Sequence, residues 1–371
     1  MAKVSLIIFF LLISTSSYSQ YFLREPYIQN LTKDTAAIIW RSAASEKFSF
    51  ELQTGSETRK YRENSPSNDH NLLIRRLSSG TTYRYSLKTF AGETVFKSFF
   101  KTAPLLYEQR TLYFSVVGDS GLNNINQLKI AQRLEATKAN FVLHTGDIVY
   151  PEGSPEDYDT KFFPFYKTFL HRIPIYPCVG NHDAANIEGF ASIFIPPYKK
   201  SASGTKRYYS FNYGFLHFTV IDTNLPYQPE SDQYKWLEKD LQKNSRRNSI
   251  KKIVFFHHPV FSAGKHGDTL SVQKYLLPLF EKYNVDLVLS GHEHAYERSF
   301  SLNLSGINKH KVLYIVTGGG GAPLYDQQNE NPSIEKYVKD YHFVNFTATK
   351  RKIKAKAING EGLMVDEFSL D

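Results

Sequence analysis

The stretch VDLVLSGHEH, residues 285–294, joins an apolar run to two histidines through one glycine. A short apolar run bounded in this way is consistent with a buried β-strand. Because alternate side chains of an extended backbone lie on the same face, we expect His292 and His294 to point together into one site where the strand ends. Imidazoles are common metal ligands and catalytic groups, so this strand end is a candidate functional site.

The same arrangement recurs at four other apolar runs. They end in GDSG (118–121), GDIVY (146–150), GNHD (180–183) and HHP (257–259). Helical patterns lie between the strands, for example over residues 123–136 and 233–243, and such alternation predicts a layered α/β domain. In that class of fold the carboxyl ends of the strands bind ligands. We therefore expect all five motifs to converge on one crevice.

The polar side chains of these motifs are oxygen and nitrogen donors. The candidate ligands are Asp119, Asp147, Tyr150, Asn181, His257, His292 and His294. A set without thiolates favours iron, zinc or manganese over copper(I) or an iron–sulfur cluster. Since a carboxylate can bridge two cations, the centrally placed Asp147 allows two metals roughly 3.5–4 Å apart. Taken alone, Asp119 and Asn181 would usually be turn or cap residues, and Tyr150 would be a core or surface residue, so only the combination favours ligation.

The chain divides into two parts. Between residues 20 and 103, five short strand-like runs (TAAIIW, KFSFELQT, NLLIRRL, TTYRYSLKT and TVFKSFFKT) predict a small antiparallel β-sandwich. PLLYEQR, residues 104–110, is interpreted as a linker, and residues 111–371 as the α/β domain. The last stretch of the chain predicts consecutive strands that close one edge of a sheet, with NGEG (359–362) as a turn.

The first 19 residues have the pattern of a cleavable signal peptide: Lys3, an apolar run over residues 4–13, and small residues before position 20. We expect an exported protein, periplasmic or secreted, without a membrane span once this segment is removed. The single cysteine, Cys178, lies in an apolar run and is expected to be a buried thiol. The formal net charge of +9 comes without an uninterrupted basic patch, which favours anionic substrates over nucleic acid as a specific partner.

The ordered set GDSG, GDIVY, GNHD, HHP and GHEHAYER resembles the metallophosphoesterase superfamily, and Tyr150 together with GHEHAYER resembles its purple acid phosphatase branch. The resemblance implies a fibronectin type III-like sandwich followed by a four-layer α/β/β/α domain. It implies an iron(III) ion held by Asp119, Asp147, Tyr150 and His294. It also implies a second divalent metal (zinc, iron or manganese) held by Asp147, Asn181, His257 and His292.

Hydrolysis of a phosphoester also needs a proton for the leaving oxygen. His182 in GNHD is the first candidate for this general acid, and His266 in FSAGKHGDT is the second. The nine-residue offset of His266 from His257 resembles the animal enzymes, whereas plant members carry a histidine pair in this loop. His258 is expected to be structural. TGGGG (317–321) is interpreted as backbone space beside the metals, because the lysine and hydroxyl of a Walker-type phosphate loop are absent.

The sequence therefore predicts an acid phosphatase with two metals, which hydrolyses small phosphate monoesters by attack of a metal-activated hydroxide. A phosphodiesterase or nucleotidase on the same scaffold is the alternative within enzymes, because metal ligands set the reaction class and pocket loops set the substrate. A catalytically inert exported binding module is the alternative of another class. The sequence leaves the physiological ester and the oligomeric state open.

Overall fold

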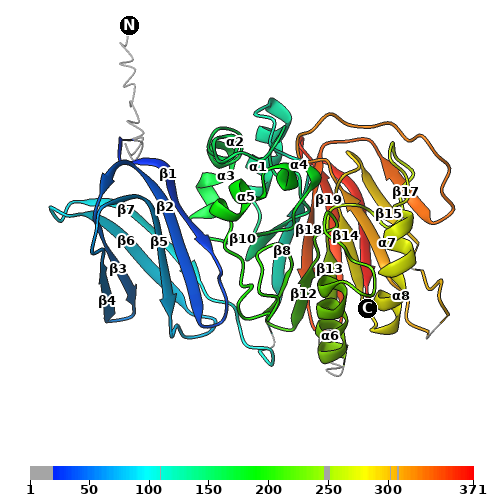
Figure 1. The fold of residues 1–371 in the computed structure, drawn as a ribbon, viewed down its shortest axis with the longest axis horizontal. Helices are drawn as coiled ribbons and strands as arrows, with labels where there is room; N and C mark the ends of the chain where they lie inside the picture. The colour runs from blue at the N-terminus through cyan, green and yellow to red at the C-terminus, as the bar shows by residue number, and fades with distance from the viewer. Residues whose placement is uncertain (1–19, 109, 246–250, 301, 307–308) are drawn as a thin grey trace, which may run out of the picture.

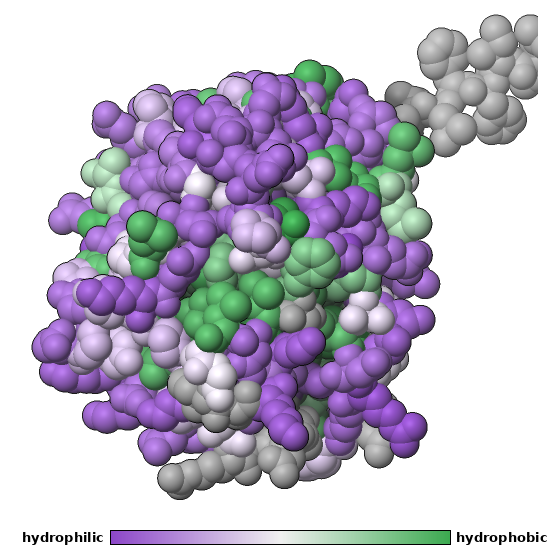
Figure 2. Space-filling view, turned by 90° about the vertical axis from the view of Figure 1, so that its right-hand side faces the viewer, coloured by the Kyte–Doolittle hydropathy of each residue, from purple (hydrophilic) through white to green (hydrophobic). Residues whose placement is uncertain are grey.

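The computed structural model describes residues 20–108, 110–245, 251–300, 302–306 and 309–371. The predicted signal peptide, residues 1–19, lies outside the described residues. Among the helices that are described, none combines the length and the apolar character needed to cross a membrane. Figure 2 shows the face at the right-hand end of Figure 1, where hydrophilic side chains predominate around a smaller apolar area.

The N-terminal part is a sandwich of two antiparallel sheets, drawn in blue in Figure 1. One sheet has the order β1 (Phe22–Gln29), β2 (Thr35–Glu46), β5 (Ser67–Arg75), and the other β4 (Glu57–Arg62), β3 (Phe48–Thr54), β6 (Thr82–Thr89), β7 (Thr94–Lys101). The predicted antiparallel sandwich is confirmed. The sequence reading missed two of its strands: β1 contains Pro26 and lacks a regular alternation, and β4 has no buried residue, so neither carries a clear strand pattern.

Two further sheets face each other in the second domain. The six-stranded sheet has the order β10 (Ile175–Pro177), β9 (Phe141–His144), β8 (Leu112–Val117), β18 (His342–Ala348), β19 (Ile353–Asn359), β20 (Met364–Leu370). The seven-stranded sheet has the order β11 (Tyr209–Tyr213), β12 (Leu216–Val220), β13 (Lys251–Phe255), β14 (Leu287–Ser290), β16 (Leu313–Thr317), β15 (Tyr296–Ser299), β17 (Ile334–Val338). The last stretch of the chain does form consecutive strands, β18 to β20, that close one edge.

Helices cover the outer faces of both sheets. A buried apolar cluster joins the six-stranded sheet to α1 (Ile125–Glu135), α2 (Pro155–Lys161), α3 (Phe163–Leu170) and α5 (Ile187–Ile193), and the short α4 (Asn181–Ala185) precedes α5. A second cluster joins the seven-stranded sheet to α6 (Asp232–Ser245), α7 (Leu270–Tyr275) and α8 (Leu277–Lys282). The expected four layers, α/β/β/α, are confirmed.

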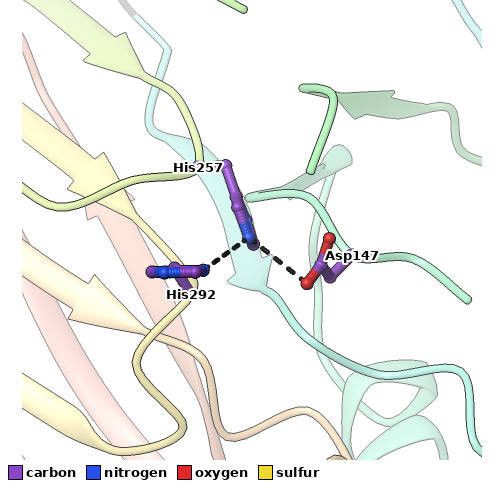
Figure 3. A group of neighbouring side chains, drawn as sticks. All are labelled: Asp147, His257 and His292. Atoms are coloured by element: carbon purple, nitrogen blue, oxygen red, sulfur yellow. Dashed lines mark hydrogen bonds and ion pairs between the residues drawn. The ribbon is translucent and has the colours of Figure 1, made fainter. Parts of the chain in front are cut away.

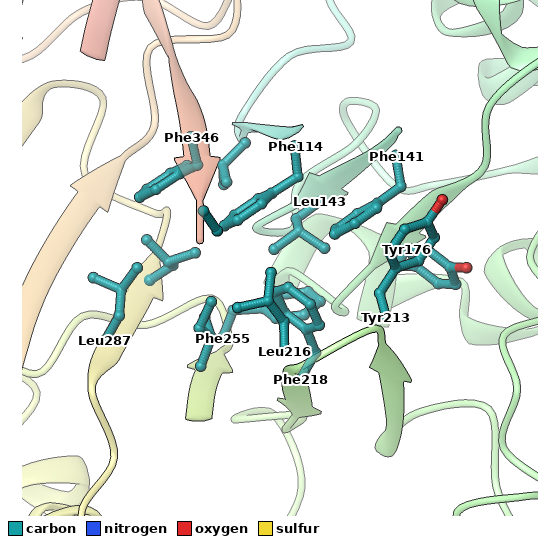
Figure 4. Packing of buried hydrophobic residues seen from close by; sticks show 14 of the residues in the cluster. Phe114, Phe141, Leu143, Tyr176, Tyr213, Leu216, Phe218, Phe255, Leu287 and Phe346 are labelled. Carbon is teal, nitrogen blue, oxygen red and sulfur yellow. The ribbon is translucent and has the colours of Figure 1, made fainter. Parts of the chain in front are cut away.

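The core between the two sheets is aromatic. Phe114 stacks on Phe346 at 4.6 Å and on Phe141 at 5.3 Å between ring centroids, and Phe218 of the opposite sheet meets Phe114 edge-on (Figure 4). Aromatic side chains bury a large area each, so this layer fixes the spacing of the sheets. Cys178 belongs to the same buried cluster, as expected for a structural thiol.

Parallel pairing places the five motifs at one edge of each sheet. β8, β9 and β10 are parallel neighbours, and so are β12, β13, β14 and β16. Each of the motifs follows the carboxyl end of one of these strands, so the loops of both sheets meet on the same side of the core. The sandwich packs beside this domain, where Tyr27 donates a hydrogen bond to the Ile193 carbonyl at 2.7 Å.

Candidate metal centre

Unusual backbone conformations aim the polar side chains at each other. Asp119, Asp147 and His292 have φ values of 57°, 50° and 71°, in the left-handed region that non-glycine residues rarely adopt. His292 and His294 therefore reach one centre through a tight turn, and the expectation of an extended backbone between them is wrong. Gly180 allows a close approach, because a Cβ atom there would lie 2.1 Å from the Asp147 carboxylate.

The first group of donors consists of Asp119, Tyr150 and His294. The Tyr150 hydroxyl lies 3.2 Å from His294 Nε2 and 3.5 Å from Asp119 Oδ1, and His294 Nε2 lies 3.5 Å from the same carboxylate oxygen. His294 Nδ1 donates to the Pro323 carbonyl at 2.8 Å, which leaves Nε2 as the nitrogen that faces the group. A ring nitrogen fixed in this way is arranged as a metal ligand is.

The second group consists of Asp147, Asn181, His257 and His292. His257 Nε2 lies 3.0 Å from Asn181 Oδ1. The same nitrogen lies 3.2 Å from His292 Nδ1 and 3.3 Å from Asp147 Oδ2 (Figure 3). His257 Nδ1 donates to the Thr145 carbonyl at 2.9 Å, so Nε2 is again the free nitrogen. Donor atoms of Asp147, His257 and His292 all lie within 4.8 Å of one another, which is close enough for one ion to bind all three.

The buried carboxylates of the centre are not balanced by an arginine or lysine among the described residues. Asp119 and Asp147 are 0% and 2% exposed, and within the described residues every ion pair they form is with a histidine. Burial raises the pKa of the Asp119 carboxyl. Burial also acts to raise the pKa of Asp147, but the charges and hydrogen bonds of His257 and His182 together outweigh it and lower that pKa. Buried carboxylates without a permanent positive partner are costly, so the residues present fit bound metal ions.

The same electrostatics act on the imidazoles. Burial acts to lower the pKa of His257, but Asp147, Asp119 and the Thr145 carbonyl together raise it to about 10. A metal must therefore displace the proton of His257, which makes metal binding dependent on pH. Burial and the positive charge of His257 lower the pKa of His292 to about 2, so this imidazole is neutral and ready to bind a cation.

The two candidate general acids lie on different sides of this centre. His182 Nε2 is 3.9 Å from Asp147 Oδ2, and its Nδ1 donates to the Pro151 carbonyl at 2.5 Å. The His266 ring lies 4.3 Å from the His292 ring, and its Nδ1 is 3.1 Å from Glu293 Oε1. Their side chains are 37% and 39% exposed, so both can meet a substrate that approaches from solvent.

Three residues near the centre were not recognised as possible site residues. His258 was expected to be structural, and its ring lies 4.6 Å from that of His292 while Nδ1 contacts the Thr223 hydroxyl at 2.7 Å. Tyr325 stacks on His294 at 4.2 Å between ring centroids. Glu293 is fully buried between the two histidines of the GHEH motif. His258 in HHP and Glu293 in GHEH lie inside motifs and so gave a signal in the sequence, whereas Tyr325 lies in a loop that has none.

The glycine run 318–321 lies against the centre, as interpreted from the sequence. A Cβ atom at Gly318 would lie 2.2 Å from the Glu293 carbonyl oxygen and 2.9 Å from Asp119 Oδ2. A side chain at this position would displace a candidate ligand, so the run supplies space for the loops that carry the donors.

Several known proteins are similar to this chain in sequence. Residues 113–296 match the family of calcineurin-like phosphoesterases. Purple acid phosphatase 15 of Arabidopsis thaliana is 28% identical over 287 residues, which cover 68% of this chain and 53% of the relative. Fe(3+)-Zn(2+) purple acid phosphatase 12 of the same plant is 29% identical over 276 residues, which cover 70% of this chain and 56% of the relative. The chain thus spans little more than half the length of these relatives.

The fold has a solved counterpart. The structure of purple acid phosphatase PPD1 from yellow lupin (Lupinus luteus) seeds superimposes with a TM-score of 0.78 at 21% identity, covering 93% of this chain and 73% of the lupin chain. The likeness extends over both the sandwich and the α/β domain, because it includes nearly all of this chain. Residues 113–296 therefore form a calcineurin-like phosphoesterase domain, in a chain whose relatives include purple acid phosphatases.

Proposed function

We propose that this protein is an exported acid phosphatase that uses two metal ions to hydrolyse small phosphate monoesters. The observation that carries the proposal is the meeting of two donor groups, Asp119–Tyr150–His294 and Asn181–His257–His292, with Asp147 in contact with His257 of the second group. The relatives named above are phosphatases, and one of them is named for iron(III) and zinc(II). The proposed domain boundaries are 20–103, 104–110 and 111–371, and export rests on the predicted signal peptide, residues 1–19.

The first donor group would hold iron(III), because phenolate and carboxylate oxygens are hard, anionic ligands. The second group would hold a divalent ion such as zinc, iron or manganese through its imidazoles and the Asn181 amide oxygen. Asp147 would contribute to both. When bound, the two ions supply Lewis acidity, which neutralises phosphate charge and lowers the pKa of a water molecule.

The protein residues supply the proton for the leaving group. His182 and His266 each have Nδ1 occupied, by the Pro151 carbonyl and by the Glu293 carboxylate, so each would present Nε2 to a substrate. Since both side chains are partly exposed, either can exchange its proton with solvent between turnovers. Replacement of each histidine by alanine separates them: loss of the general acid should slow esters of alkyl alcohols much more than activated aryl esters.

The test combines metal analysis with two matched substrates. The purified protein is loaded with iron and zinc, and turnover is measured on a chromogenic phosphate monoester and the corresponding diester between pH 4 and pH 8. We expect about two metals per chain and faster hydrolysis of the monoester at acid pH. Faster hydrolysis of the diester would support the phosphodiesterase alternative. Bound metal without turnover of either ester would support the inert binding module.

A further inference from the structure

The loop that carries His266 is held by the carboxylate of Glu293, which is neither a proposed metal ligand nor a proposed proton donor. Glu293 accepts hydrogen bonds from the backbone N–H groups of Lys265, at 2.8 Å, and His266, at 2.5 Å. Its Oε1 atom also lies 3.1 Å from His266 Nδ1. One fully buried side chain therefore fixes both the backbone and the imidazole of His266.

The backbone of this loop lies against the Glu293 carboxylate at Gly264. A Cβ atom at Gly264 would lie 2.3 Å from Glu293 Oε2, so only glycine lets the loop reach the carboxylate. Because the Glu293 oxygen accepts the proton on Nδ1, Nε2 of His266 is left free. The His266 ring also packs against the ring of His292 at 4.3 Å, which places it beside the candidate metal centre.

We infer that Glu293 is a positioning residue, which orients His266 so that its imidazolium form donates the proton on Nε2 to the leaving oxygen of the substrate and is left as the neutral tautomer protonated on Nδ1. The inference rests on the proposed function and deepens it, because it selects His266 over His182 as the general acid. A histidine that is aimed by a buried carboxylate loses less orientational freedom in the reaction than an exposed loop histidine, and misplacement by about 1 Å can cost about 100-fold in rate.

A second buried carboxylate in the same region provides a matched control. Glu297 accepts a hydrogen bond from the Ser262 hydroxyl at 2.6 Å and from the Ala263 N–H at 2.8 Å, so it supports the same loop without touching His266. Replacement by glutamine is tolerable there, since the Ser262 hydroxyl can accept a bond from the new amide. At Glu293 both oxygens face backbone N–H groups, so glutamine must place an NH₂ group against one of them.

The experiment compares four variants in the metal-loaded protein: Glu293→Gln, His266→Ala, the double variant, and Glu297→Gln. Turnover is measured on phosphate monoesters whose leaving groups range from activated phenols to alkyl alcohols. We expect Glu293→Gln to slow alkyl esters by about 10–100-fold and activated aryl esters by less than about 3-fold. The double variant should match His266→Ala within about 2-fold, because Glu293 acts through His266.

Three results would overturn the inference: equal losses on both classes of ester, additive losses in the double variant, or the same leaving-group dependence in Glu297→Gln. Metal content is measured in every variant, so a loss of ligands is recognised. If Glu293→Gln does not fold, Glu293→Asp provides the comparison, because it keeps the charge but withdraws it by one methylene and should show a smaller change of the same kind.

A readout without turnover separates this inference from the proposed function. In the zinc-loaded protein, nitrogen NMR of the neutral His266 ring should show the proton on Nδ1 in the wild type and in Glu297→Gln. Glu293→Gln should shift the proton toward Nε2 or give a mixture. An unchanged tautomer in Glu293→Gln would refute the positioning role even if the protein hydrolyses phosphate esters. A wild type that turns over no monoester would refute the proposed function, and the tautomer would still decide the role of Glu293.

Discussion

Asp366 and the pair Asp119 and Asp147 are buried aspartates at two separate places in the α/β domain, and their partners differ. Asp366 in β20 accepts bonds from Arg298 Nε at 2.6 Å, Tyr296 Oη at 2.8 Å and Lys336 Nζ at 3.1 Å. These partners come from β15 and β17, so the cluster ties the two sheets together. At the candidate metal centre, the ion pairs of Asp119 and Asp147 within the described residues are with imidazoles alone.

The difference separates a structural ion pair from a site that needs an added ion. Arg298 and Lys336 carry permanent positive charge, so the Asp366 cluster is balanced by the protein itself; burial acts to raise the pKa of Asp366, but Arg298 and its other partners lower it. An imidazole must be neutral to bind a metal, and it then no longer balances a carboxylate. The metal centre therefore remains electrostatically incomplete until cations bind.

The prediction with the largest expected effect concerns Asp147, whose negative charge is proposed to be balanced by the bound cations. Asp147→Asn removes a negative charge that both proposed metals share. Replacement of a residue that only contacts a metal ligand lowers metal affinity or activity by about 10–100-fold. Since Asp147 is proposed to be a ligand itself, we expect loss of at least one metal per chain and a fall in turnover of at least about 100-fold. Metal analysis and kinetics on a phosphate monoester measure both. A variant that keeps two metals and near-normal turnover would show that Asp147 is no shared ligand.

The Asp366 cluster should respond in the opposite way. Asp366→Asn leaves Arg298 and Lys336 without their common buried partner, which should lower the free energy of unfolding by about 3 kcal/mol. Metal content and turnover of the folded variant should stay near those of the wild type, because the cluster does not contact the donor groups. Denaturant unfolding and metal analysis check the two halves of this prediction. Loss of metal in the folded variant would remove the distinction between the two clusters.

Glu297 offers a third way to neutralise a buried carboxyl group, by protonation. Burial raises its pKa from the usual 4.5 to about 7, so the folded state favours the neutral form. Between pH 4.5 and pH 7 the unfolded chain loses this proton first, and the free energy of unfolding should fall by about 3 kcal/mol as the pH rises. Glu297→Gln should lack this fall. Unfolding curves of both proteins at a series of pH values test it, and parallel curves would contradict the assignment.

Tyr150 and Tyr296 provide the finest comparison, since each hydroxyl lies near a buried aspartate. Burial and Asp119 raise the pKa of Tyr150 well above its usual value, so only a bound iron(III) ion would ionise it. A phenolate on iron(III) absorbs visible light, so the oxidised, iron-loaded protein should be purple to pink. Tyr150→Phe should abolish the colour and lower turnover by only about 10-fold, because the phenolate neither attacks nor donates a proton. Absorption spectra give the result, and Tyr296→Phe should keep the colour.

The amino-acid sequence by itself determined which donor side chains are available and at which strand ends they lie. An apolar run followed by glycine and a donor is a local pattern, since burial of the strand and the sharp turn after it depend on neighbours in the chain. Asp119, Asp147, Asn181 and His292 were located in this way, and His257 was located by the apolar run that it follows directly. The alternation of strands with helices likewise predicted the α/β domain, and the antiparallel sandwich followed from the spacing of its short strands.

Only the tertiary structure decided which donors meet and what supports them. Packing of the six-stranded sheet against the seven-stranded sheet brings the loop after β9 to the loop after β13, where 112 residues separate Thr145 from His257, and no periodicity within either strand encodes that contact. For the same reason His258, Tyr325 and Glu293 were not recognised: their neighbours belong to other loops. The turn at His292 was also decided by the fold, because Asp119 accepts the His292 N–H at 3.1 Å and thereby stabilises a left-handed conformation that the local sequence does not favour.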